Sequence, residues 1–170
     1  LKHQFAQAFQ LALGRACAEQ FGEQTHAVMF VNRMPAPELL IAVQREQHWG
    51  QGLQRHGVAL AAIALVLDWN HPEETEQERA DADRVIELLR RFPGALLCTV
   101  QMPTSRDGLQ QRRRNLVANV NSVSRRAAER GVAASFHPNS PPTSINRTAE
   151  DYEVILNGLD RNVTGWTPDV

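Results

Sequence analysis

Two short apolar runs in the chain end in polar residues that can bind a metal ion. Residues 132–136 lead into His137 and Asn139, and residues 163–167 lead into Asp169, with an amphipathic helix predicted between the two runs. In a parallel β/α protein, strands of this kind bring their carboxyl-terminal residues to one rim, where loops form the site. Because an imidazole and a carboxylate from neighbouring strands can share a divalent metal, His137 and Asp169 are candidate ligands.

Polar residues also follow the other predicted strands: Asn32 and Arg33, then Asp68, Asn70 and His71, then Gln101. Structural explanations remain open beside the functional ones. His71 precedes a proline and can cap the next helix, Asp68 can accept hydrogen bonds in a turn, and His137 can bond to backbone in a turn. Spacing alone therefore makes the metal site a hypothesis.

The elements that position these residues are predicted from apolar periodicity and from capping and stop signals. Helices are expected at residues 2–21, 38–55, 72–92, 108–130 and 149–159, and strands at 26–31, 58–67, 95–100, 132–136 and 163–167. We expect Pro72 to occupy a first helical position, Asp107 to be an N-cap, and Thr148 to form a capping box with Asp151. The run 58–67 is alanine-rich, so its composition also permits a helix.

Composition limits the class of protein. The chain has 170 residues, 42% of them hydrophobic and 22% charged, with a net charge of -1, which fits one globular domain and gives no electrostatic case for nucleic acid or a membrane surface. The basic stretches 112–114 and 125–126 are expected on a solvated helix face. Cys17 and Cys98 are far apart, and free thiols in a cytoplasmic protein are the expectation. No apolar segment approaches the roughly 20 residues that cross a bilayer.

Alternation of strands and helices predicts an α/β fold with a parallel sheet. A doubly wound open sheet fits the chain length, whereas a complete eightfold barrel takes about 250 residues. However, no glycine-rich phosphate-binding loop follows any strand, which weakens the nucleotide-binding forms of the open sheet.

A family resemblance favours the barrel. The motifs His137-Pro-Asn139, Thr148-Ala-Glu-Asp-Tyr152, Asp160 and Gly165-Trp-Thr-Pro-Asp169 resemble the middle of the xylose-isomerase-like TIM barrels. These are sugar phosphate isomerases and epimerases, with inosose dehydratases and endonuclease-IV-type enzymes as relatives. In such proteins the fifth strand often ends in Asp-x-Gly-His, and Asp169 and Val170 match its first two positions. The resemblance spans residues 38–170, and residues 1–35 lie outside it.

The resemblance implies metal-assisted isomerisation or epimerisation of a sugar or polyol, on an incomplete barrel of about five strands. Asp169 would bind a divalent metal (Mn, Mg, Co or Zn), and His137 would be a ligand or an acid/base. Asp68, His71, Gln101 and Asn139 would contact substrate. The ordinary residue at the His137 position in these enzymes is a glutamate, and Gln101 replaces the histidine of the zinc nucleases.

Three alternatives to the isomerase remain. They are a dehydratase-like lyase with His137 as acid/base, a degenerate barrel that binds a sugar or a partner protein without catalysis, and an open-sheet binding domain. We also expect 170 residues to be part of a longer protein, or a half-barrel that pairs with another chain through open strand edges, as in a homo-oligomer.

Overall fold

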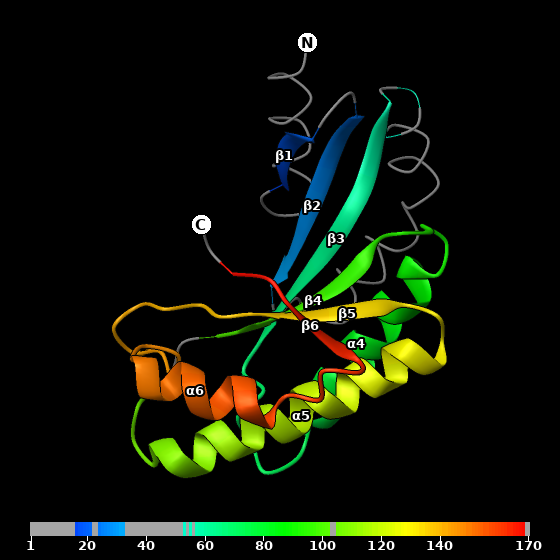
Figure 1. Cartoon of the computed structure of the whole chain (residues 1–170). Helices are drawn as coiled ribbons and strands as arrows, with labels where there is room; N and C mark the ends of the chain where they lie inside the picture. The colour runs from blue at the N-terminus through cyan, green and yellow to red at the C-terminus, as the bar shows by residue number, and fades with distance from the viewer. Residues whose placement is uncertain are drawn as a thin grey trace.

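A single sheet organises the protein. The computed structural model describes residues 16–21, 24–32, 53, 55, 57–102 and 105–168. Within them the sheet has six strands in the order β1-β2-β3-β4-β5-β6, with β1 antiparallel to β2 and each later pair parallel. The strands are β1 (Ala16–Phe21), β2 (Gln24–Asn32), β3 (Val58–Leu67), β4 (Leu96–Gln101), β5 (Ala133–His137) and β6 (Thr164–Trp166). Figure 1 shows them fanning out in chain order.

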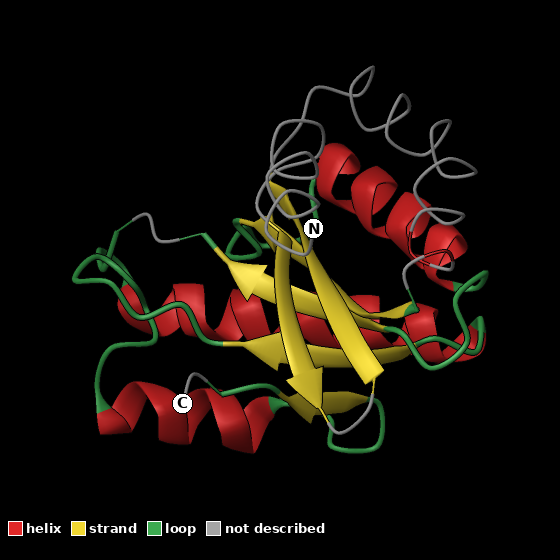
Figure 2. Cartoon of the chain, turned by 90° about the horizontal axis from the view of Figure 1, so that it is seen from above, coloured by secondary structure: helices red, strands yellow, loops and turns green. Residues whose placement is uncertain are grey.

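Three described helices connect the later strands. They are α4 (Glu76–Leu89), α5 (Leu109–Glu129) and α6 (Ala149–Gly158), and Figure 1 shows them gathered below the sheet. Figure 2 gives the same arrangement from above, with the strands lying across the helices. The predicted parallel sheet with alternating helices is therefore confirmed. No helix in the described part of the chain is both long enough and apolar enough to span a bilayer.

The two faces of the sheet differ in side-chain size. Ile63, Leu65 and Leu67 of β3, with Leu97 and Phe136, join residues of the three helices in the main apolar core. The alternate positions are mostly small and form a separate buried cluster of Ala62, Ala64, Val66, Cys98 and Val100. We call this second side the small-residue face; strand pairing adds Ser135 and His137 to it, opposite Cys98 and Val100.

Helix starts differ in part from expectation. Pro72 does not occupy the first helical position, because α4 begins at Glu76 and its N-cap is Thr75. The Thr75 side chain accepts from the Glu78 amide, and the Glu78 side chain accepts from the Thr75 amide. Gly108 is the N-cap of α5, since the Asp107 side chain bonds to Ser105 instead. The predicted capping box of Thr148 with Asp151 at the start of α6 is confirmed.

The first predicted helix is wrong where the structure tests it. Residues 16–21 form β1, which pairs with β2 from Ala16 opposite Met29 to Phe21 opposite Gln24. Apolar residues recur at helical spacing over the whole stretch 2–21. Pairing with β2, however, determines the conformation of residues 16–21. Residues 2–15 and most of the predicted helix at 38–55 lie outside the described residues. The ambiguous run 58–67 is β3, and the other predicted strands are confirmed to within two residues at each end.

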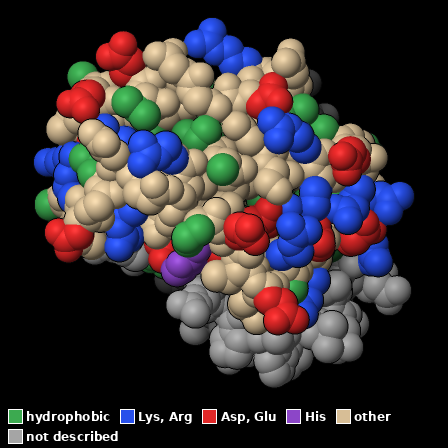
Figure 3. Space-filling view, turned by 90° about the horizontal axis from the view of Figure 1, so that it is seen from below, with side chains coloured by type: hydrophobic (Ala, Val, Ile, Leu, Met, Phe, Trp, Pro, Cys, Tyr) green, Lys and Arg blue, Asp and Glu red, His purple; other side chains and the backbone are tan. Residues whose placement is uncertain are grey.

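The expectation of a solvated basic face holds for only part of α5. Figure 3 shows Arg side chains interspersed with acidic ones on the face seen from below. Arg126 binds Glu74 at 2.6 Å and Asp83 at 3.1 Å. Arg113, in contrast, has a side chain only 5% exposed and pairs with buried Asp151, so its expected solvated position is wrong. A buried guanidinium requires a compensating carboxylate, and α6 supplies it.

Candidate active site at the carboxyl ends of the strands

The carboxyl ends of β3, β4 and β5 lie at one edge of the sheet. Val66 pairs with Val100, and Val100 pairs with His137, so these three residues stand at the same level on the small-residue face. Asp68 is the first residue after β3. The fold thus brings the carboxyl ends of β3, β4 and β5 to a common rim.

His137 is the last residue of β5 and is half-buried. Its Nδ1 lies 3.0 Å from the carbonyl oxygen of Thr167. Since a carbonyl oxygen can only accept, Nδ1 carries the hydrogen, and in the neutral ring Nε2 then carries the lone pair. Metal-binding histidines are commonly oriented by such a bond from the other ring nitrogen. This geometry fits His137 as a ligand through Nε2 or as a base.

Thr167 is itself held by three hydrogen bonds. Its amide donates to the carbonyl of Phe136 at 3.0 Å, which extends the β5–β6 pairing, and its carbonyl accepts from His137. Its hydroxyl donates to Ser135 Oγ at 2.7 Å. Cys98 also contacts the Ser135 and Thr167 side chains; burial raises the pKa of its thiol, and these two hydrogen bonds only partly oppose the rise. Cys98, Ser135 and Thr167 therefore form a polar group on the small-residue face, and this group contacts His137 through the Thr167 carbonyl.

The side chains of Asp68 and His71 lie close together after β3. His71 Nε2 lies 3.4 Å from one Asp68 carboxylate oxygen, and Asn70 Nδ2 donates to the other at 2.7 Å. The side chains of Asp68 and His71 are 29% and 49% exposed, so both are accessible. The acceptor role considered for Asp68 in a turn is present. Contact of Asp68 and His71 with a substrate stays a prediction.

The loop that carries this pair is strained and firmly held. Trp69 is fully buried with φ of 57°, a left-handed conformation that a bulky residue rarely adopts. Its amide donates to Glu78 Oε1 at 2.9 Å and its indole Nε1 donates to the Val100 carbonyl at 3.1 Å. Strained backbone of this kind often occurs at functional sites.

Two asparagines of α5 complete the support of that loop. Asn115 donates to the carbonyl of Asn70, and Asn119 donates to the carbonyls of Trp69 and His71, each at 2.9 Å. Both asparagines are buried. Sequence analysis missed them, although two asparagines four residues apart beside the apolar stripe of a helix are a detectable signal of buried polar contacts.

Gln101 and Asn139 lie in different surroundings from His137. Gln101 is fully buried, in the alternation that also buries Leu97 in the main core, and its Oε1 accepts from Ser144 Oγ at 3.5 Å. Asn139 is half-buried in the loop after β5. Contact of these two side chains with a substrate stays a prediction.

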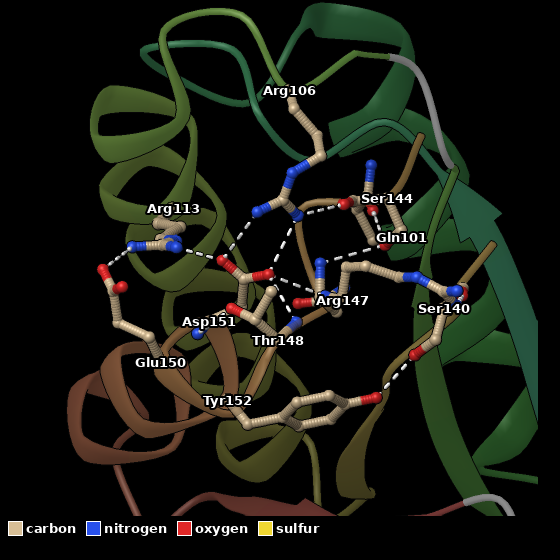
Figure 4. A network of polar contacts seen from close by, with 11 residues as sticks. Gln101, Arg106, Arg113, Ser140, Ser144, Arg147, Thr148, Glu150, Asp151 and Tyr152 are labelled. Carbon is tan, nitrogen blue, oxygen red and sulfur yellow. Dashed lines mark hydrogen bonds and ion pairs between the residues drawn. The ribbon is translucent and has the colours of Figure 1, made fainter. Parts of the chain in front are cut away.

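A second polar group, absent from the sequence predictions, fixes the loop after β5 (Figure 4). Its centre is Asp151, which is fully buried at the start of α6. Arg106 donates to both carboxylate oxygens, at 2.8 and 3.3 Å, and Arg113 donates to one of them. The amides of Arg147 and Thr148 add bonds of 2.8 and 2.7 Å.

Burial opposes ionisation of Asp151, but the hydrogen bonds from Arg106, from the Thr148 and Arg147 amides and from Arg113 outweigh it. The pKa of this carboxyl therefore lies well below its ordinary value. Arg106 also donates to the Ser144 carbonyl at 2.7 Å. The ionised carboxylate thus ties the loops after β4 and β5 to α5.

The described residues contain no group of three or more His, Cys, Asp and Glu side chains that could hold a metal ion. Asp169, the predicted partner of His137, lies outside them. The assignment of His137 and Asp169 as metal ligands therefore stays a prediction, and the Nδ1 bond of His137 is of the kind that metal-binding histidines make.

Parallel strands covered by helices are the arrangement of a segment of a β/α barrel. Comparison with known proteins agrees: the sequence profile described as xylose isomerase-like TIM barrel matches residues 14–170. The chain belongs to this family, and the resemblance seen in the sequence is confirmed. No curated protein matches the chain significantly.

Solved structures share the fold at low sequence identity. The crystal structure of IOLI protein with a binding zinc atom has a TM-score of 0.62 at 17% identity, covering 82% of this chain and 51% of its own. The probable 3-DHS dehydratase AsbF, involved in petrobactin synthesis in Bacillus anthracis, has a TM-score of 0.62 at 14% identity, covering 84% and 52%. A sugar phosphate isomerase/epimerase from Parabacteroides distasonis ATCC 8503 has a TM-score of 0.48 at 15% identity, covering 74% and 47%. The chain therefore spans about half the length of the first two structures.

Proposed function

We propose that this chain carries part of the active site of a metal-assisted isomerase or epimerase that acts on a sugar or polyol. The observation that supports this most directly is the His137 ring, whose Nδ1 donates to the Thr167 carbonyl, the kind of bond that commonly orients a metal-binding histidine. Membership of the xylose isomerase-like family and the zinc atom in the IOLI structure are consistent with a divalent metal.

His137 and Asp169 would hold the metal, which when bound would polarise a substrate carbonyl and acidify the neighbouring C–H. The chain's own residues would orient the substrate. Asp68 and His71 are accessible at the end of β3 and can exchange hydrogen bonds with substrate hydroxyls. Gln101 and Asn139 are further candidate contacts, and His137 is the alternative acid/base.

Metal binding by the purified protein provides the first test. We expect calorimetric titration with Mn²⁺, Co²⁺ or Zn²⁺ to show one site whose affinity falls at least about tenfold in His137→Gln and in Asp169→Asn. His71→Gln is the matched control, because this histidine is engaged with Asp68 and should leave metal affinity unchanged. Equal affinities in all four proteins would refute the assigned ligands.

Product analysis provides the second test. Incubation with a panel of ketoses in D₂O should give isomerised or epimerised sugar with deuterium at the carbon next to the carbonyl, because a base removes that proton. A protein that binds metal but exchanges no such proton is not an isomerase of this kind.

A dehydratase-like lyase is the second candidate, favoured by the identity of His137 itself. An imidazole at this position can donate a proton to a leaving hydroxyl after accepting one, and its Nδ1 is already oriented by Thr167. An unsaturated product from a keto-inositol, detected by ultraviolet absorbance, would replace the isomerase proposal with this one. Absence of both metal binding and turnover would favour a non-catalytic barrel.

A further inference from the structure

Among the described side chains from β3 onward, the small-residue face is apolar except for His137 and one connected set. Ala62, Ala64, Val66 and Val100 line it on β3 and β4. Cys98 and Ser135, which pair across β4 and β5, together with Thr167 beyond β6, form the exception. Buried hydroxyl groups are costly unless bonded, so an isolated polar set on an apolar face requires an explanation.

The contacts within this set converge on one peptide group. Ser135 Oγ accepts the Thr167 hydroxyl at 2.7 Å, and the Phe136 carbonyl accepts the Thr167 amide at 3.0 Å. Thr167 is therefore fixed through both its side chain and its backbone. Its carbonyl oxygen then accepts from His137 Nδ1 at 3.0 Å.

We propose that Thr167 and Ser135 are positioning residues that set the tautomer and orientation of the His137 ring. The Ser135–Thr167 hydroxyl bond fixes the rotation of the Thr167 residue, and the fixed carbonyl holds the hydrogen of the imidazole on Nδ1. Nε2 is thereby kept as the basic nitrogen. The use of this role in catalysis rests on the proposed function of His137.

A matched control lies in β6, three residues before Thr167. Thr164 Oγ1 is buried and has no hydrogen-bond partner, whereas Thr167 Oγ1 is bonded to Ser135. Thr164→Val and Thr167→Val are thus the same chemical change on neighbouring residues of one segment. Only the second removes a hydrogen bond that leads to His137. Thr167→Ser retains the hydroxyl and is the rescue variant.

The first measurement reads the ring directly and requires neither metal nor substrate. In metal-free protein labelled with ¹⁵N-histidine at neutral pH, His137→Gln identifies the two ring-nitrogen signals of His137. We expect one protonated Nδ1 and one unprotonated Nε2 in the unaltered protein, in Thr164→Val and in Thr167→Ser. In Thr167→Val and Ser135→Ala the two signals should move toward each other, because both tautomers become populated.

The second measurement is metal affinity. Loss of a residue that orients a ligand typically weakens metal binding by roughly 10- to 100-fold, and we expect that loss in Thr167→Val and Ser135→Ala but not in the two controls. Unchanged ring signals in a folded Thr167→Val protein would overturn the positioning role. If the unaltered protein shows the expected ring signals but binds no metal, the positioning role stands and the proposed metal site is refuted.

Discussion

Arg113, near the start of α5, donates a hydrogen bond to the fully buried carboxylate of Asp151, in the first turn of α6. Arg106 donates to the same carboxylate from the loop after β4. A single anion thus joins three segments around the loop that follows His137. Removing one member of such a group leaves charges buried without compensation, which is more costly than never having buried them.

Asp151→Asn should therefore destabilise the protein strongly. The amide cannot neutralise the two guanidinium groups, and loss of one partner of a buried ion pair costs about 3–5 kcal/mol. Urea unfolding followed by circular dichroism measures the change in free energy of unfolding. A loss below about 1 kcal/mol, the range of exposed pairs, would contradict the buried arrangement.

Glu150→Gln is the matched control for that substitution. Glu150 pairs with the same Arg113, at 3.1 Å, but its side chain is 76% exposed. Solvent screens such a pair, so we expect a loss of about 0–1 kcal/mol. Comparable losses in the two variants would show that charge at the start of α6, rather than burial, is what matters.

Stability should also depend on pH through Asp151. Its pKa in the folded protein lies below the ordinary value, so its contribution is complete above a pH of about 4 and is lost as the pH falls further toward the folded-state pKa. The difference in unfolding free energy between the unaltered protein and Asp151→Asn should shrink from pH 5 to pH 2. In this difference, the pH-dependent contributions of the carboxylates that both proteins share cancel. A constant difference over this range would contradict the depressed pKa.

Asn119→Ala should loosen the loop that carries Asp68 and His71. The substitution removes the donor for the carbonyls of Trp69 and His71, and leaving buried acceptors unsatisfied costs about 1–3 kcal/mol. Hydrogen exchange of the Trp69 amide should accelerate together with the fall in stability. Gln110→Ala, at an exposed position of the same helix, should stay within about 0.5 kcal/mol.

Gly158→Ala should reverse the usual effect of this substitution in a helix. Alanine is ordinarily favoured over glycine there by about 1 kcal/mol. At Gly158, however, a Cβ would lie 2.8 Å from Val117 Cγ1, where α6 crosses α5. We expect a net loss of about 1–3 kcal/mol, measured by thermal unfolding.

Val117→Ala in the same chain tests the cause of that loss. If the contact with Val117 is responsible, Gly158→Ala should stabilise the protein in the Val117→Ala background, because the space for the new methyl group is then open. An equal loss in both backgrounds would place the strain elsewhere.

The fold was predictable where it depends on local sequence patterns. The apolar runs that became β4 and β5, and the capping box of Thr148 with Asp151, depend on residues a few positions apart. The same reasoning failed at β1, where pairing with β2 overrode helical spacing, and at Arg113, whose burial depends on a carboxylate 38 positions away. The predicted N-cap at Asp107 was also wrong, because the Asp107 carboxylate accepts from the Ser105 hydroxyl.

The sequence by itself determined that strands alternate with helices, that polar residues follow the strands, and that His137 stands at the end of one of them. Each of these properties is local, because periodicity, capping and chain order act over a few residues. Only the tertiary structure decided that Asn119 supports Trp69 from 50 positions away and that Thr167 orients His137 from 30 positions away. Hydrogen bonds between distant segments produce no periodic pattern in the sequence, because they depend on strand register and helix packing. Register and packing are determined by the complete fold.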